Sequence, residues 1–150
     1  GGLAGVDKMP DAMMPRDRGA VINVSSVAGF GASPGSASYA STKAWMNVFT
    51  ESLALELASA GSRVKVQALC PGFTLSEFHD VIGVGRGRIP RSWWMTAEEV
   101  AAASLRGLER GRIYVIPGLR YRAVVALEAM VPGRVRRAVT RVYARWTKHV

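Results

Sequence analysis

The sequence has a single cysteine, Cys70, and only two histidines among its 150 residues. One cysteine cannot form a disulfide within the chain. So few thiol and imidazole groups also argue against a structural zinc site, which needs four such ligands. We therefore expect neither a disulfide framework nor a bound metal.

Long apolar stretches are also missing. No run of about 18 or more uncharged apolar residues occurs, so no transmembrane helix is expected. The first residues show neither the basic segment nor the apolar core of a secretory signal, and a cytoplasmic protein is the simplest expectation. Apolar residues make up 49% of the chain, enough for one buried core in a single globular domain.

Acidic residues are scarce: 20 Lys and Arg stand against 11 Asp and Glu, which gives a net charge of +9. The excess gathers at the C-terminus, because residues 132–150 contain no acidic residue and six basic ones: Arg134, Arg136, Arg137, Arg141, Arg145 and Lys148. We separate this basic amphipathic tail, residues 132–150, from residues 1–131. Two interpretations stay open: peripheral contact with an anionic membrane or a partner, or a solvated helix packed on its own domain. Nucleic-acid binding is not expected, since no aromatic platform accompanies the charge.

Strands and helices alternate in the apolar pattern. Three short runs rich in β-branched residues, 20–24, 64–69 and 113–116, are typical of buried parallel strands. Residues 38–60 carry apolar side chains at helical spacing, and a capping-box sequence at Thr96 and Glu99 predicts a second helix that runs to Gly111. This order predicts an α/β doubly wound parallel sheet. Residues 73–94 are expected to form a long loop at the carboxyl end of the second strand, where ligands bind in such sheets.

Three side chains suggest proton-transfer chemistry. Tyr39 and Lys43 lie four residues apart near the start of the predicted long helix, so they should share one face. An ammonium group and the positive end of a helix both favour a phenolate, and a tyrosine so placed can exchange a proton with a substrate oxygen. Ser26 follows the first strand, where its hydroxyl could hold the same oxygen.

These residues resemble a known family. The lead-in Asn23-Val-Ser-Ser26, the pair Tyr39-x-x-x-Lys43 and the turn Cys70-Pro-Gly-Phe-Thr74 are together similar to short-chain dehydrogenases/reductases (SDRs), over about residues 19–118. The resemblance implies a Rossmann-like fold that uses NAD or NADP. It assigns Ser26, Tyr39 and Lys43 as catalytic. It also implies that the cofactor is contacted by Tyr39, Lys43, Pro71, Gly72, Thr74 and Ser76.

The implied activity is the interconversion of an alcohol and a carbonyl in a small-molecule substrate. Trp93, Trp94 and Met95 lie in the loop that would roof the site, which favours a lipophilic substrate unless they only anchor the next helix. The resemblance also implies a homo-oligomer, formed in part through the long helix. The family's Gly-rich phosphate turn has no counterpart here, because Gly83 to Gly87 neither follows a strand nor opens a helix.

We therefore expect an incomplete fold whose N-terminal βαβ half is missing, with residues 1–131 as the catalytic half. An alternative is an inactive SDR fragment that acts as a membrane- or partner-binding module through its basic tail.

Overall fold

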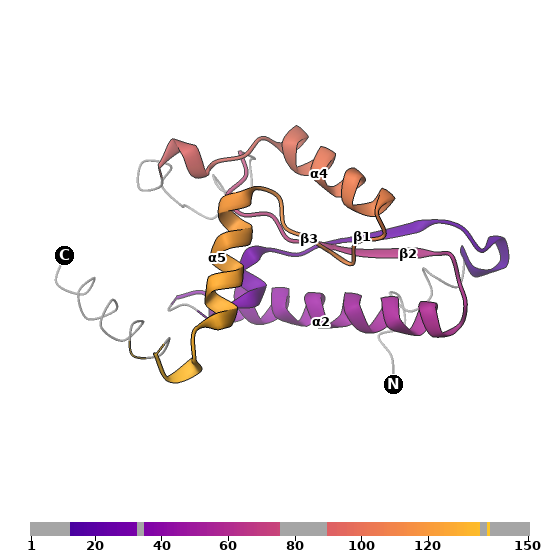
Figure 1. Ribbon diagram of the computed structural model, residues 1–150, viewed down its shortest axis with the longest axis horizontal. Helices are drawn as coiled ribbons and strands as arrows, with labels where there is room; N and C mark the ends of the chain where they lie inside the picture. The colour runs from indigo at the N-terminus through magenta and orange to yellow at the C-terminus, as the bar shows by residue number, and fades with distance from the viewer. Residues whose placement is uncertain (1–12, 33–34, 76–89, 136–137, 139–150) are drawn as a thin grey trace.

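The computed structural model describes residues 13–32, 35–75, 90–135 and 138 (Figure 1). Its strands and α-helices are, in chain order, β1 (Ala20–Val24), α2 (Ala37–Ser59), β2 (Lys65–Leu69), α4 (Ala97–Glu109), β3 (Tyr114–Val115) and α5 (Leu119–Met130). Three short 3-10 helices accompany them: η1 (Met14–Arg16), η2 (Val27–Phe30) and η4 (Arg91–Trp93). The predicted strands and long helices therefore lie where the apolar pattern indicated, although β3 is shorter than expected.

The sheet is parallel and has the order β1-β2-β3. Val21 of β1 pairs with Val66 of β2, and Leu69 of β2 pairs with Val115 of β3. Because all three strands run in one direction, their carboxyl ends meet at one edge of the sheet. The N-terminus of α2 lies at that same edge (Figure 1).

The two faces of the sheet are covered by different helices. On one face α2 packs through Leu57 against Val21, Val64 and Val66. On the other face α4 packs through Val100 against Leu69 and Val115. Figure 1 shows the sheet between these two helices. The predicted doubly wound α/β arrangement is therefore confirmed.

Polar contacts fix α4 on its face of the sheet. The Gln67 amide of β2 donates to the Ser104 carbonyl over 3.1 Å and accepts from the Ser104 hydroxyl over 2.6 Å, and both residues are buried. At the start of α4 the predicted capping box is present, since Thr96 Oγ1 accepts from the Glu99 amide and Glu99 Oε2 accepts from the Thr96 amide. The Gln67 and Ser104 contacts would be lost if the helix moved on the sheet, whereas the capping box satisfies amides at the start of the helix itself.

Helix α5 was not predicted. It begins after Gly118, whose positive φ of 82° suits a glycine. It crosses the carboxyl edge of the sheet at a steep angle to the strands (Figure 1) and contacts η2. Its apolar residues lie on its inner and outer faces alike, so no single stripe marks it in the sequence.

The predicted loop of residues 73–94 is anchored at both ends. Thr74 forms a parallel bridge with Met95, supported by hydrogen bonds from the Leu75 amide to the Met95 carbonyl and from the Met95 amide to the Phe73 carbonyl. Residues 76–89, with Ser76, lie outside the described residues, as does most of the predicted tail, namely residues 136–137 and 139–150. No helix in the described ranges combines the length and the apolar character needed to cross a membrane.

Candidate active site

The predicted site residues lie at the carboxyl edge of the sheet. Lys43 and Tyr39 come from the first turns of α2, whereas Ser26 follows β1. The Lys43 ammonium donates to the Val24 carbonyl at the end of β1, with Nζ and O 2.9 Å apart. Nζ also lies 5.6 Å from the centroid of the Tyr39 ring, within the range of a cation–π contact. The structure therefore brings Tyr39 and Lys43 together, as their spacing predicted.

Ser26 is buried and caps η2. Its Oγ accepts a hydrogen bond from the Ala28 amide over 3.1 Å, and among the described residues its hydroxyl donates to none. The neighbouring Ser25 serves the packing instead, because its hydroxyl donates to the Lys43 backbone carbonyl over 3.0 Å. Ser26 thus keeps a hydroxyl proton that a ligand oxygen could accept.

Gly29 allows η2 to lie directly against α2. A Cβ at this position would lie 2.8 Å from the Lys43 carbonyl carbon and 2.7 Å from Asn47 Nδ2, closer than real Cβ contacts. No side chain therefore fits between the two segments. The close approach places the Ser26 segment alongside the turn of α2 that carries Lys43.

The turn after β2 joins the same region. The Val27 amide donates to the Pro71 carbonyl over 3.1 Å, and the Ser25 amide donates to the Leu69 carbonyl over 2.7 Å. Thr74 Oγ1 donates to the Gly72 carbonyl over 3.2 Å. Pro71 is therefore bonded directly to the segment that carries Ser26, and the Thr74 hydroxyl closes the turn onto Gly72. The remaining predicted turn residue, Ser76, lies outside the described residues.

Tyr121 of α5 holds this turn, a role that the sequence reasoning missed. Its buried ring fills the space beside Gly72, where a Cβ would lie 2.0 Å from the ring. Its hydroxyl accepts from the Phe73 amide over 2.9 Å and donates to the Trp93 carbonyl over 2.5 Å. Burial raises the pKa of Tyr121, so the hydroxyl remains a donor at neutral pH. No local sequence signal marks this residue, because its helix was not foreseen.

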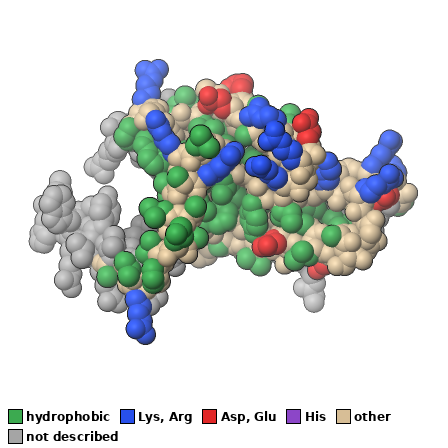
Figure 2. Space-filling model, viewed as in Figure 1, with side chains coloured by type: hydrophobic (Ala, Val, Ile, Leu, Met, Phe, Trp, Pro, Cys, Tyr) green, Lys and Arg blue, Asp and Glu red, His purple; other side chains and the backbone are tan. Residues whose placement is uncertain are grey.

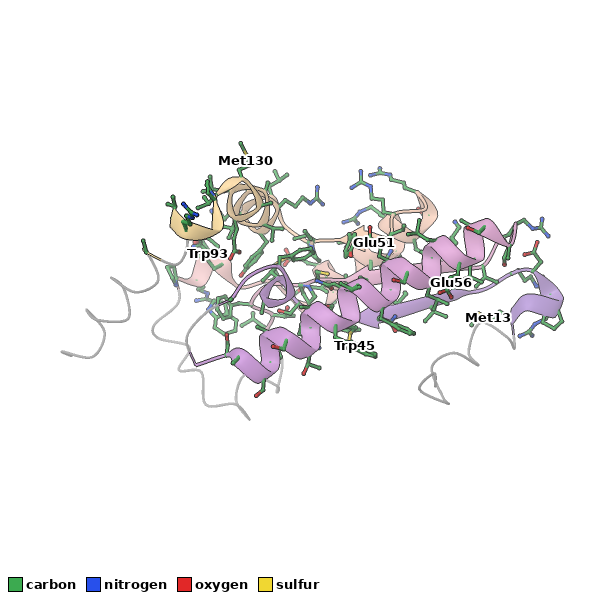
Figure 3. The ribbon with its side chains drawn as sticks, turned by 90° about the horizontal axis from the view of Figure 1, so that it is seen from below. Met13, Trp45, Glu51, Glu56, Trp93 and Met130 are labelled. Carbon is green, nitrogen blue, oxygen red and sulfur yellow. The ribbon has the colours of Figure 1, made fainter. Side chains whose placement is uncertain are left out.

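Aromatic contacts bind the roof segment to the turn and to α5. The Trp94 and Phe73 rings lie 5.5 Å apart, as do the Trp93 and Tyr121 rings, the latter pair edge to face. Figure 3 shows Trp93 beside α5. The anchoring role considered for the two tryptophans is thus present in the structure, while their contact with a substrate stays a prediction.

Cys70 is buried below the turn. Its thiol donates to Asn47 Oδ1 with a separation of 3.4 Å. Burial raises the pKa of Cys70 to about 12, so the thiol is protonated at neutral pH and is no nucleophile there. In the ranges that the structure describes, no group of three or more His, Cys, Asp or Glu side chains could hold a metal ion.

The three predicted catalytic residues come from α2 and from the segment after β1. Tyr39 remains 39% exposed. The Lys43 ammonium has three hydrogens, one of which is used by Val24. Two donors therefore remain for the phenol oxygen or for a ligand hydroxyl.

Comparison with known proteins identifies the fold and the family. The family model for short chain dehydrogenase matches residues 1–84. The 3-oxoacyl-(acyl-carrier-protein) reductase FabG of Staphylococcus aureus is 42% identical over 77 residues, which are 51% of this chain and 30% of that protein.

Two solved structures of short-chain dehydrogenases are also similar to this chain. A short chain dehydrogenase/reductase from Burkholderia phymatum in complex with NAD has a TM-score of 0.71 and 25% identity, over 82% of this chain and 51% of that one. A short-chain dehydrogenase from Sphingobium yanoikuyae in complex with NADPH has a TM-score of 0.65 and 28% identity, over 87% and 54%. The chain spans about half of these structures and less than a third of the reductase. Since the family model covers more than half of its 150 residues, the chain belongs to the short-chain dehydrogenase family.

Proposed function

We propose that this chain provides the proton-transfer side of an NAD- or NADP-dependent oxidoreductase that interconverts an alcohol and a carbonyl. The observation that carries the proposal is the placement of the Lys43 ammonium, bonded to the Val24 carbonyl at 2.9 Å and 5.6 Å from the Tyr39 ring. A fixed cation beside a partly exposed phenol places a charge and a proton-exchanging group at one edge of the sheet, as proton transfer to a substrate oxygen requires.

Each of the three residues has a separate role in this proposal. Tyr39 gives a proton to the substrate oxygen during reduction and takes one during oxidation. Lys43 holds the cofactor's ribose through its ammonium hydrogens beside the Tyr39 ring. Ser26 donates its hydroxyl hydrogen to the same substrate oxygen and so holds it within reach of Tyr39.

The donors at this edge fit the nicotinamide end of a dinucleotide. Lys43 has two uncommitted hydrogens for ribose hydroxyls, and the Pro71 to Thr74 turn offers backbone groups and a hydroxyl for the amide. The bound dinucleotide would supply or accept the hydride. The complexes of the two structural relatives with NAD and with NADPH support either cofactor.

A lipophilic substrate is part of the proposal. Trp93, Trp94 and Phe73 gather beside the turn, half-buried and in contact through their rings or with Tyr121. Such a cluster offers apolar area to an acyl chain or a ring. The name of the Staphylococcus aureus relative, a reductase of 3-oxoacyl groups on a carrier protein, supports the acyl-chain class.

A homo-oligomer through α2 also remains a proposal. The outward side of this helix exposes Trp45, Val48 and Leu55, and Trp45 stacks on Phe49 with their rings 5.2 Å apart. Adjacent exposed apolar side chains on one helix are typical of an interface. A second copy of the helix would cover them.

The Tyr39→Phe variant tests the proposed mechanism. We expect turnover of a panel of long-chain 3-oxoacyl thioesters and secondary alcohols, followed through NAD(P)H absorbance, to fall about 10²- to 10⁴-fold, the usual contribution of a general acid or base. Tyr114→Phe is the matched control. The Tyr114 hydroxyl bonds to Glu51 and the Asn47 carbonyl rather than to the proposed triad, so this variant should keep its turnover.

Two results would contradict the proposal. Equal turnover by Tyr39→Phe and the unsubstituted chain would remove Tyr39 from the mechanism. If the folded chain neither turns over any substrate nor binds NADH or NADPH in saturation-transfer NMR, the alternative of a non-catalytic binding module would replace the enzyme.

A further inference from the structure

The outer face of α5 is apolar although it points away from the molecule. Its inner face packs through Tyr121, Val125 and Glu128, which are buried or half-buried. The opposite face, at the spacing of successive helical turns, carries Leu119, Ala123, Ala126, Leu127 and Met130, all of them exposed. Leu119 is 79% exposed, Leu127 64% and Met130 80%. We call these five residues the α5 stripe.

Figures 2 and 3 show the same feature. Hydrophobic side chains follow α5 on the face turned toward the viewer in Figure 2, and Met130 points away from the body of the molecule in Figure 3. Three exposed large apolar side chains on one face of a short helix are unusual on a surface that only water contacts. The stripe therefore calls for a partner of apolar character.

A group of arginines lies next to the stripe on the same face. Arg106, Arg110, Arg112 and Arg122 line a surface hollow between the C-terminal half of α4, the end of β3 and the start of α5. Figure 2 shows basic side chains gathered over this part of α4, beside the green band on α5. We call this group the arginine hollow.

The charge of the arginine hollow is not neutralised within the described part of the chain. The ion pair in the described ranges joins Arg63 and Asp17, neither of which lines the arginine hollow. Arg122 donates through Nε to the Ile116 carbonyl over 2.8 Å, a contact that positions the guanidinium without cancelling its charge. Four cations around one hollow favour an anionic group such as a phosphate.

We propose that the α5 stripe and the arginine hollow form one docking surface for an anionic lipid membrane. In this arrangement the stripe enters the boundary between headgroups and acyl chains, while the arginines contact lipid phosphates. An apolar helix face with basic residues at its side is the pattern of helices that lie in a membrane interface. Residues 132–150, which follow α5 in the sequence, contain six basic residues and no acidic one, and so bring further positive charge to the chain.

The charges disfavour a second copy of the chain as the occupant. A twofold interface places the same patch on both partners, so two α5 stripes in contact would bring two arginine hollows toward each other. The acidic residue of α5, Glu128, is turned inward against Gly31 and cannot compensate. Like charges at such an interface weaken association.

Vesicle flotation tests the proposal. The chain is mixed with vesicles of phosphatidylcholine containing about 30% phosphatidylglycerol, or of phosphatidylcholine alone. We expect flotation with the anionic vesicles only, and weaker binding at high salt. Leu127→Ser with Met130→Ser should reduce the affinity at least about tenfold, because two apolar side chains lose their burial. Leu105→Ser, at a 57% exposed leucine on α4, is the matched control and should bind normally.

A charge-matched pair tests the arginine hollow. Arg106→Gln should weaken binding about fivefold, as expected for one cation near an anionic surface. Arg18→Gln removes the same charge from the far end of the sheet and should have a smaller effect. Free inorganic phosphate at millimolar concentration should not release the chain from the vesicles, whereas phosphate that does release it would indicate a small-anion site and overturn the membrane proposal.

The remaining outcomes also decide the question. Failure of the unsubstituted chain to float with anionic vesicles would refute the proposal. Unchanged flotation of the double variant Leu127→Ser with Met130→Ser would also refute it, because the tail alone would then account for the binding. A dimer in lipid-free sedimentation that this double variant dissociates would identify a second copy as the occupant. These readouts do not depend on turnover, so they separate this proposal from the proposed enzyme activity.

Discussion

The contact between Gly72 and Tyr121 predicts a large effect of adding one methyl group to the turn. In Gly72→Ala the new Cβ would lie 2.0 to 2.5 Å from three atoms at the far end of the Tyr121 ring. The backbone at Gly72 does not need the left-handed conformation, so alanine meets no backbone strain there. A loss of stability in Gly72→Ala would therefore come from the steric contact with the Tyr121 ring.

The ring has little freedom to move aside. Tyr121 is buried, and its hydroxyl is held by the Phe73 amide and the Trp93 carbonyl. If the ring stays, the overpacked site costs about 1 to 3 kcal/mol. If it swings away, two hydrogen bonds are lost at about 0.5 to 1.5 kcal/mol each. We therefore expect Gly72→Ala to lower the free energy of unfolding by about 2 kcal/mol.

Urea titrations followed by tryptophan fluorescence would measure this free energy in a double-mutant cycle. Tyr121→Leu lacks the ring atoms that the new Cβ would meet. In the Tyr121→Leu background the Gly72→Ala substitution should therefore cost less than about 0.5 kcal/mol, and the two changes should show strong coupling. Equal costs of Gly72→Ala in both backgrounds would refute the role assigned to Tyr121.

Two further predictions concern groups with shifted pKa values. Burial raises the pKa of Cys70 to about 12, so a thiol reagent at pH 8 should label the chain only after unfolding; rapid labelling of the folded chain would contradict this. Arg63 beside Asp17 lowers the pKa of this carboxyl below its usual 3.8, and Asp17→Asn keeps a side chain that tolerates the positive φ of 44°. Above pH 4 this variant should therefore melt at a lower temperature than the unsubstituted chain. The difference should shrink as the pH falls through the pKa of Asp17 in the folded chain. A difference in melting temperature that stays constant down to pH 2 would exclude the Asp17–Arg63 pair as its cause.

Local patterns were sufficient to predict the layers of the fold. The apolar run at β2 is buried from Val66 to Leu69 because α2 and α4 cover its two faces, whereas Ile22 and Val24 of β1 remain exposed. The Thr96 and Glu99 capping box depends only on residues three apart. The contact of Tyr39 with Lys43 follows from the helical repeat in the same way. In each case the interacting groups are close in sequence or share one simple period.

Contacts between distant segments could not be predicted this way. The Phe73 amide and the Tyr121 hydroxyl are 48 residues apart, and no local pattern shows which side chain will meet the turn. Helix α5 escaped prediction for a different reason. Tyr121 and Val125 make its inner face apolar while Leu119, Leu127 and Met130 make its outer face apolar, so the usual contrast between a buried and a solvated face is absent.

That double-sided character also links the two proposals through one rigid element. Tyr121 on the inner face fixes the turn of the candidate site, and Leu127 on the outer face belongs to the proposed membrane surface. Both faces belong to one helix of 12 residues. A membrane bound to its outer face would therefore have a fixed orientation relative to the candidate site, which its inner face contacts. Lipophilic substrates concentrate in membranes because burial of each CH₂ group is favourable. A site held beside the bilayer would therefore meet such substrates at a higher local concentration than a site free in water.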